Sequence, residues 1–140
     1  MQLVGGRSLL LAYAGEAYLL AGRLDEARES AQRALVSATE HMERGYEGWA
    51  LRLLAETALR SATADISHVG DLARRALAVA QELGMRPLAA HAHCVLGRSL
   101  AVAADVERAR DHLSAAVGLL ESMNMQRWLG PARDALDRLA

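Results

Sequence analysis

The segment Leu11-Ala-Tyr-Ala-Gly-Glu-Ala-Tyr18 decides the fold, because two later segments repeat its pattern. Residues 51–58 read Leu-Arg-Leu-Leu-Ala-Glu-Thr-Ala, and residues 93–100 read His-Cys-Val-Leu-Gly-Arg-Ser-Leu. The fifth place of each segment holds a small residue, namely Gly15, Ala55 or Gly97, and these lie 40 and 42 residues apart. Recurrence at such a period predicts a helical-repeat protein.

A second recurring set follows each of these segments. Ala27, Val69 and Ala109 lie 42 and 40 residues apart, and small or apolar residues stand four and seven places after each of them. Both sets have helical spacing, so each copy of the pattern predicts a hairpin of two helices. Small residues where the two helices face each other let the backbones approach closely, and the larger apolar residues beside them are buried.

The composition supports an all-α fold in a single domain covering residues 1–140. Ala and Leu, both strong helix formers, supply 29 and 24 of the 140 positions. We expect three hairpins at residues 7–43, 46–83 and 87–123, followed by a capping helix at 126–140. The six hairpin helices are predicted at residues 7–21, 24–43, 46–60, 67–83, 87–103 and 106–123.

Stop and cap signals support these boundaries. Gly22 and Gly84 are placed to end helices, while Asp65 or Ser67 and Asp105 are placed to cap the helices that follow them. Pro131 leaves two possibilities for the last helix: it starts the regular part, or it kinks a helix that begins near Gln126.

The charged residues argue against several classes of function. All 16 basic residues are Arg, so a phosphate-loop lysine and a Schiff-base lysine are excluded. The formal net charge of −1 gives no field that would hold nucleic acid or an acidic membrane. The sequence also lacks a Gly-x-Ser-x-Gly elbow and a His-Glu-x-x-His motif. We therefore expect a non-enzymatic protein without a cofactor.

Cysteine content and hydropathy point to the cytoplasm. Cys94 is the only cysteine, so it cannot form an internal disulfide, which suits a reducing compartment. The apolar segment at residues 9–21 is shorter than the roughly 20 residues that span a bilayer, and Glu16 interrupts it. We expect neither a membrane nor a nucleic acid as partner. Single-stranded nucleic acid would need a basic stripe with stacking aromatics, whereas the groove offers only Trp49.

The pattern resembles the tetratricopeptide repeat. Small residues at the eighth, twentieth and twenty-seventh places of each hairpin, with apolar residues at the fourth, seventh, eleventh and twenty-fourth, follow that family's signature across nearly the whole chain. The resemblance implies a right-handed α-α superhelix that binds other proteins. The usual Trp at the fourth place is replaced by Leu11, Leu51 and His93. The usual Pro at the thirty-second place is replaced by Thr39, Gln81 and Glu121.

A narrower resemblance concerns three sequence segments, at residues 48–54, 76–88 and 126–129. They are similar to the C-terminal repeats of large bacterial signalling proteins, which join a nucleotide cyclase or kinase module, a signalling ATPase and a helical-repeat tail. This likeness implies the regulatory tail of a signalling protein as the context of the chain.

Spacing predicts which side chains line the concave surface of such a solenoid. The first helices of successive hairpins line that surface, with facing residues three, four and seven apart. Leu9 and Ala12 are placed there beside the candidate partner-binding residues, which are Glu16, Trp49, Arg52, Glu56, Arg60, His91, Cys94 and Arg98. The resemblance implies that this groove binds an extended peptide, and guanidinium groups beside an indole suit an acidic one. The family's asparagine-based carboxylate clamp is not matched.

Two alternatives for these residues stay open. Arg52, Glu56 and Arg60 are spaced four apart, which is also typical of a solvated salt ladder along a single helix. Trp49 could bury its ring against the preceding helix instead of facing a partner.

A metal site is not expected. His91, His93 and Cys94 are zinc-ligand types, but residues two apart on a helix point to opposite sides. His93 falls at a core position, and no third ligand is spaced to join the other two. Cys94 is interpreted as a small buried apolar residue.

The first helix predicts self-association. Glu16 is the only charged residue between Arg7 and Arg23, whereas a terminal repeat normally has a polar outer face. We expect the first hairpin to pair with a second copy through Leu9, Leu10, Tyr13 and Leu20, or to stack on an upstream repeat. The leading hypothesis for function is an interaction module that binds a protein or peptide segment, and the alternative is an oligomerisation scaffold whose groove stays empty.

Overall fold

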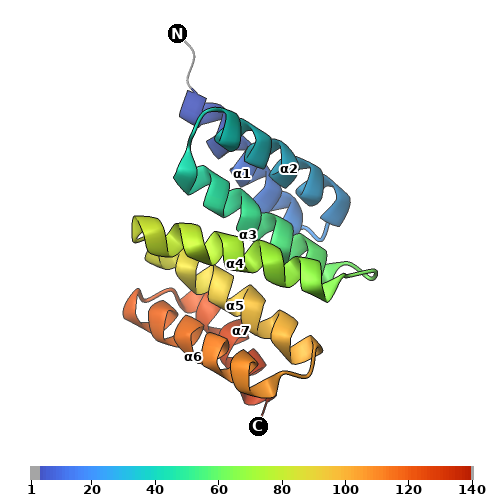
Figure 1. Ribbon diagram of the computed structural model, residues 1–140, viewed down its shortest axis with the longest axis vertical. Helices are drawn as coiled ribbons and strands as arrows, with labels where there is room; N and C mark the ends of the chain where they lie inside the picture. Colours follow the sequence, from blue (N-terminus) through green and yellow to red (C-terminus); the bar gives the residue numbers. More distant parts are fainter. Residues whose placement is uncertain (1–3, 140) are drawn as a thin grey trace.

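The computed structural model describes residues 4–139. Over these residues the chain forms seven α-helices: α1 (Val4–Leu20), α2 (Leu24–Glu40), α3 (Arg44–Arg60), α4 (Ile66–Leu83), α5 (Arg86–Val102), α6 (Val106–Ser122) and α7 (Gln126–Asp137). Each helix packs against the next one, and α3 also contacts α1 and α5. In the resulting stack, α1 and α2 lie at one end of the long axis and α6 and α7 at the other (Figure 1).

The predicted all-α fold is confirmed for the described residues. The predicted domain also includes residues 1–3 and Ala140, which lie outside them. The largest boundary differences are at the start of α1, the end of α2 and the end of α7, each three residues from the prediction. Pro131 lies inside α7, which begins at Gln126, so Pro131 does not start the helix.

Small residues set the distance between paired helices, as the repeat pattern predicts. A Cβ atom added to Gly97 on α5 would lie 2.6 Å from Leu113 Cγ and 3.1 Å from the Ala109 carbonyl oxygen on α6. A Cβ added to Gly15 on α1 would lie 3.7 Å from the Ala27 carbonyl oxygen on α2. Both glycines therefore stand where one helix of a pair comes closest to the other.

Alanine is the commonest small residue at the contacts between neighbouring helices. Fully buried alanines recur at intervals of three, four or seven residues along the even-numbered helices. They are Ala27, Ala31, Ala34 and Ala38 on α2, Ala73, Ala76 and Ala80 on α4, and Ala109 and Ala116 on α6. Ala55 on α3 lies in one apolar cluster with Val69 and Ala73 on α4. The core thus combines these closely packed alanines with buried larger side chains such as Leu51, Leu96 and Leu113.

Five of the connections within residues 4–139 end the preceding helix in the same way. A residue with positive φ follows the helix: Gly22 (76°), Met42 (56°), Gly84 (66°), Ala104 (63°) or Asn124 (56°). The next backbone N–H then donates to a carbonyl five residues back, as from Arg23 to Tyr18 at 2.9 Å and from Glu43 to Ala38 at 2.8 Å. This bond closes the last helical turn and reverses the chain in a few residues. Only the turns at Gly22 and Gly84 were predicted from the sequence.

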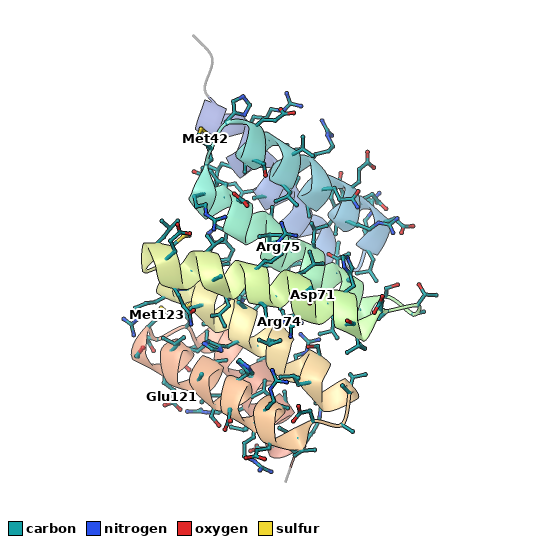
Figure 2. All side chains as sticks on the ribbon, viewed as in Figure 1. Met42, Asp71, Arg74, Arg75, Glu121 and Met123 are labelled. Carbon is teal, nitrogen blue, oxygen red and sulfur yellow. The ribbon has the colours of Figure 1, made fainter. Side chains whose placement is uncertain are left out.

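The outer side of the stack is charged. Arg74 Nη2 donates to Asp71 Oδ1 at 2.6 Å on α4, and Arg75 is exposed beside them. Figure 2 shows these residues along α4 and Glu121 on α6.

Asp65 caps α4 by accepting from the His68 N–H at 3.3 Å, so Asp65 and not Ser67 is the cap. Asp105 caps α6 in the same way, as predicted.

Candidate functional site

The candidate site lies where α1, α3 and α5 line up and α7 contacts them. Arg52 and Glu56 on α3 are one helical turn apart, and Arg60 follows one turn later, so the three side chains share one face. His91 on α5 and Trp128 on α7 contact the same face. This arrangement brings together residues from four helices that are far apart in the sequence.

Arg52 is buried and links three helices. Its guanidinium is 3% exposed, pairs with Glu16 Oε2 of α1 through Nη1, and lies 3.4 Å from His91 Nδ1 of α5 through Nη2. Among the described residues, Arg52 Nε and Glu16 Oε1 have no hydrogen-bond partner. Buried polar atoms without a partner are costly, so these two atoms mark a place where a further polar group would be favourable.

Glu56 is the second buried charge of the site. It is 4% exposed and accepts from Arg98 Nη1 of α5, at 2.9 and 3.0 Å from its two oxygens. Arg60 Nη2 and Nε also donate to it, at 2.8 and 3.2 Å. Burial by itself raises the pKa of Glu56, but the charges of Arg98, Arg52 and Arg60 outweigh burial and hold the pKa below its ordinary value. Glu56 is therefore ionised and shared by two arginines.

His91 lies between two indole rings. Its ring centroid is 5.6 Å from that of Trp49 and 4.8 Å from that of Trp128, with both contacts edge to face. Burial, with a smaller contribution from the charge of Arg52, lowers the pKa of His91 to about 3. The imidazole is therefore neutral at neutral pH. Because a guanidinium can only donate, Nδ1 accepts from Arg52 and the proton is on Nε2.

Two adjoining pockets flank these residues. The first, the basic pocket, has a volume of about 330 Å³. Its charged lining residues are Arg52, Arg60, Arg98, Arg138, Glu56 and Asp134. Four guanidinium groups thus face two carboxylates, so this pocket is positive in a chain whose formal net charge is −1.

The second pocket, the aromatic pocket, has a volume of about 350 Å³. Its ring-bearing lining residues are Tyr13, Tyr46, Trp49, His91 and Trp128. Glu16 and Arg52 supply its charged groups, and Leu9, Ala12 and Leu53 complete it. Arg52, His91 and Trp128 line both pockets and separate one from the other.

The eight residues predicted for the groove all line these two pockets. Glu16 and Trp49 line the aromatic pocket, whereas Glu56, Arg60, Cys94 and Arg98 line the basic pocket, and Arg52 and His91 line both. The alternative of a solvated salt ladder is wrong for two of its three members. Arg52 and Glu56 are buried, and Arg52 pairs with α1 and not along its own helix.

Trp49 lies at the groove as predicted, but its buried side does not pack where the alternative placed it. Its half-buried ring packs against Val79 and Leu88, which belong to α4 and α5, and not against the preceding helix α2. The other side of the residue lines the aromatic pocket. Trp49 is therefore part of the core and part of the site at once.

Sequence reasoning missed several lining residues. Trp128 and Asp134 belong to α7 and Arg138 directly follows it. The repeat pattern does not cover this segment, so their place in the pocket lining could not be derived from it. Tyr46 stands at the start of α3, three residues before Trp49, and this helical spacing was the available signal.

The residues predicted for self-association fall into two groups. Leu10, Tyr13 and Leu20 are 69%, 65% and 52% exposed and lie on the outer side of α1. Leu9 is half-buried and lines the aromatic pocket, so it does not belong to that exposed side. Tyr13 lies at the edge between the two and borders the pocket as well.

Histidine and cysteine outside these pockets do not gather into a metal-binding group. In the part of the chain that the structure describes, no three His, Cys, Asp or Glu residues are placed to hold one ion. His93 Nδ1 instead lies 3.0 Å from His112 Nδ1 of α6. Cys94 is half-buried, and burial raises the pKa of its thiol, which leaves it in the weakly reactive protonated form.

The fold and the site define a stack of α-helices with a charged and an aromatic pocket along one side. No model of a known protein family matches the chain, and no curated protein matches it either. Among helices of residues 4–139, none combines the length and apolar character that crossing a membrane requires.

Proposed function

We propose that this protein is a non-enzymatic helical-repeat module of the tetratricopeptide kind. In this proposal its three hairpins and capping helix form a right-handed solenoid, and the groove along α1, α3 and α5 binds an acidic segment of a partner protein. The equivalent surroundings of Gly15 and Gly97 support the repeat, because each glycine faces the second helix of its own hairpin. The context that the sequence resemblance suggests is the cytoplasmic regulatory tail of a bacterial signalling protein.

The basic pocket is the observation that carries the proposed ligand chemistry. Four arginines and only two acidic residues line it. Glu56 already occupies one guanidinium edge of Arg98 and of Arg60, yet the side chains of these arginines are still 35% and 38% exposed. Guanidinium groups recognise carboxylates through paired hydrogen bonds, so an acidic segment suits this pocket better than a basic or neutral one.

Arg98 and Arg138 are the residues to change in a test of this proposal. Arg52 is unsuitable, because its removal would leave Glu16 without its partner. We expect the double variant Arg98→Gln/Arg138→Gln to bind a fluorescein-labelled peptide of alternating Asp and Gly about tenfold or more weakly than the wild type. Fluorescence anisotropy at two salt concentrations measures this.

A control variant removes one positive charge at a position that does not line the pocket. Arg133→Gln removes an arginine of α7 whose partner is Glu121 of α6. This variant should bind the peptide as the wild type does, and a peptide with Asn in place of Asp should bind none of the proteins. Equal affinity of the wild type and the double variant, or no saturable binding by the wild type, would contradict the proposal.

The exposed side of α1 favours a second candidate, an assembly scaffold. Leu10, Tyr13 and Leu20 follow one another at helical intervals of three and seven residues. In the repeat register Leu10 corresponds to Ala50 of α3 and Tyr13 corresponds to Leu53. Both of those residues are buried, and Leu53 lies in one cluster with residues of α1 and α2. The face that α3 buries against the preceding hairpin is therefore the face that α1 exposes.

We expect this face to pair with that of a second copy. The wild type should then show a mass that rises towards twice 15.1 kDa with concentration in static light scattering. Leu10→Glu/Leu20→Glu should remain monomeric, because two carboxylates would be brought into an apolar contact. Val36→Glu, on an exposed position of α2, is the control that should still dimerise. A wild type that stays monomeric at every concentration would contradict this candidate.

A further inference from the structure

Aromatic side chains are rare in this protein and are concentrated at one place. The sequence contains two Trp, three Tyr and no Phe. Tyr13 of α1, Tyr46 and Trp49 of α3, and Trp128 of α7 all line the aromatic pocket. Four of the five aromatic residues thus surround a single cavity, although three different helices supply them.

These rings all line the pocket, although Trp49 and Trp128 also pack against core clusters on their buried sides. Tyr13 is exposed, and Tyr46, Trp49 and Trp128 are only half-buried. The space between them has a volume of about 350 Å³, whereas protein interiors leave few voids larger than a water molecule. Pockets that bind ligands have volumes from about 300 Å³ upward and are lined by apolar and aromatic side chains with a few polar groups.

The charged groups around the pocket leave it without a net charge. Glu16 and Arg52 are paired there and cancel each other. The guanidinium carbons of Arg52 and Arg127 lie 5.7 and 5.3 Å from the centre of the Trp128 ring. The Trp128 ring therefore already makes cation–π contacts with two arginines of this protein. An uncharged ring can still make edge-to-face contacts with the surrounding aromatics.

We propose that the aromatic pocket anchors an aromatic side chain of the same acidic segment whose carboxylates lie in the basic pocket. This inference rests on the proposed function and gives its ligand a second feature. The two pockets adjoin along Arg52, His91 and Trp128, so one extended segment can occupy both. Arg52 is shared by both pockets, and its buried Nε has no hydrogen-bond partner among the described residues.

The two tryptophans of the chain provide the measurement. Both line the aromatic pocket, so the intrinsic tryptophan fluorescence and the two indole N–H signals in an NMR spectrum report on it directly. The probes are acetylated and amidated peptides that contain one Phe and, one to four residues further on, two Asp. Phe is chosen because the protein contains none and because its fluorescence does not overlap that of tryptophan.

At one or more of these spacings, we expect the Phe peptide to bind about tenfold more tightly than the same peptide with Ala in place of Phe. Binding of that Phe peptide should also shift both indole N–H signals. Tyr46→Ala should remove this advantage of Phe over Ala and leave the affinity for the Ala peptide unchanged. Leu10→Ala is the control, since Leu10 is as exposed on α1 as Tyr13 but does not line the pocket. It should leave both affinities as in the wild type.

The outcomes separate this inference from the proposed function. If Phe and Ala peptides bind equally, and both depend on Asp and on Arg98, the proposed function stands and the aromatic anchor is wrong. If no Asp peptide binds at any spacing, both are wrong. If phenylpropionate alone shifts the indole signals with the affinity of the Phe peptide, the pocket binds a free aromatic acid, and the peptide anchor is overturned.

Discussion

Gly97→Ala should lower the free energy of unfolding by up to about 2 kcal/mol. The added Cβ would lie 2.6 Å from Leu113 Cγ, a branched carbon within the α6 core, and 3.1 Å from a backbone oxygen that cannot move independently. Overpacking a tight contact costs about 1 to 3 kcal/mol, and the higher helix propensity of alanine returns about 1 kcal/mol. Urea unfolding followed by circular dichroism measures the difference.

Gly15→Ala is the matched control at the equivalent place of the first hairpin. There the nearest atom to the new Cβ is Leu53 Cδ1, a terminal methyl group, at 3.3 Å. That methyl group can shift, so the gain in helix propensity should dominate, and the variant should be as stable as the wild type or up to about 1 kcal/mol more stable. Equal destabilisation by both substitutions would show that the local crowding at Gly97 is not the cause.

Mild acid should destabilise the protein from about pH 6.5 downward. Burial lowers the pKa of His91 from 6.5 to about 3, so below pH 6.5 the unfolded chain takes up a proton that the folded protein does not. Stability therefore falls as the pH falls, by at most about 1.4 kcal/mol per pH unit for this one residue. Between pH 6.5 and 4.5 His91 should account for a loss of about 2 kcal/mol.

Other groups add to this slope in the same direction. Burial also lowers the pKa of His93 and of His112. The pKa of Glu56 is held below 4.5, so its stabilising contribution is present above that pH and is lost as the pH falls further. The groups that face His91 are Arg52 and Glu56.

His91→Gln isolates the contribution of this histidine. Glutamine can still accept a hydrogen bond from Arg52 but does not titrate, so we expect a smaller loss of stability between pH 6.5 and 4.5 than in the wild type. Unfolding midpoints in urea, measured at intervals of half a pH unit, give the two slopes. The same slope in both proteins would mean that His91 is not the buried group that acid protonates.

The repeat spacing predicted the helices well, because small residues recur wherever two helices come close. The end of α2 was missed by three residues for a specific reason. Met42 has a φ of 56°, a conformation that sequence reasoning expects of Gly or Asn. The conformation is stabilised by the hydrogen bond from the Glu43 N–H to the Ala38 carbonyl. This bond joins two backbone groups, so the side chains in the sequence do not indicate it.

The candidate site was predictable in its position but not in its pairings. Helical spacing alone placed Arg52 and Glu56 on one face of α3. It could not show that Arg52 pairs with Glu16 of α1 or that Glu56 pairs with Arg98 of α5, because those distances depend on how the helices pack. For the same reason, the contact of Trp128 with His91 could not be anticipated.

The connection between α3 and α4 differs from the other five in residues 4–139. It runs through residues 61–65, has no residue with positive φ, and is exposed or half-buried throughout. Its backbone bonds are local, such as that from the Ala64 N–H to the Ser61 carbonyl at 3.2 Å. Foreign sequence is best tolerated in such a segment, where neither core nor long-range hydrogen bonds are interrupted. A reporter domain inserted between Ala62 and Thr63, or new chain termini created there, would therefore leave the helices on both sides intact.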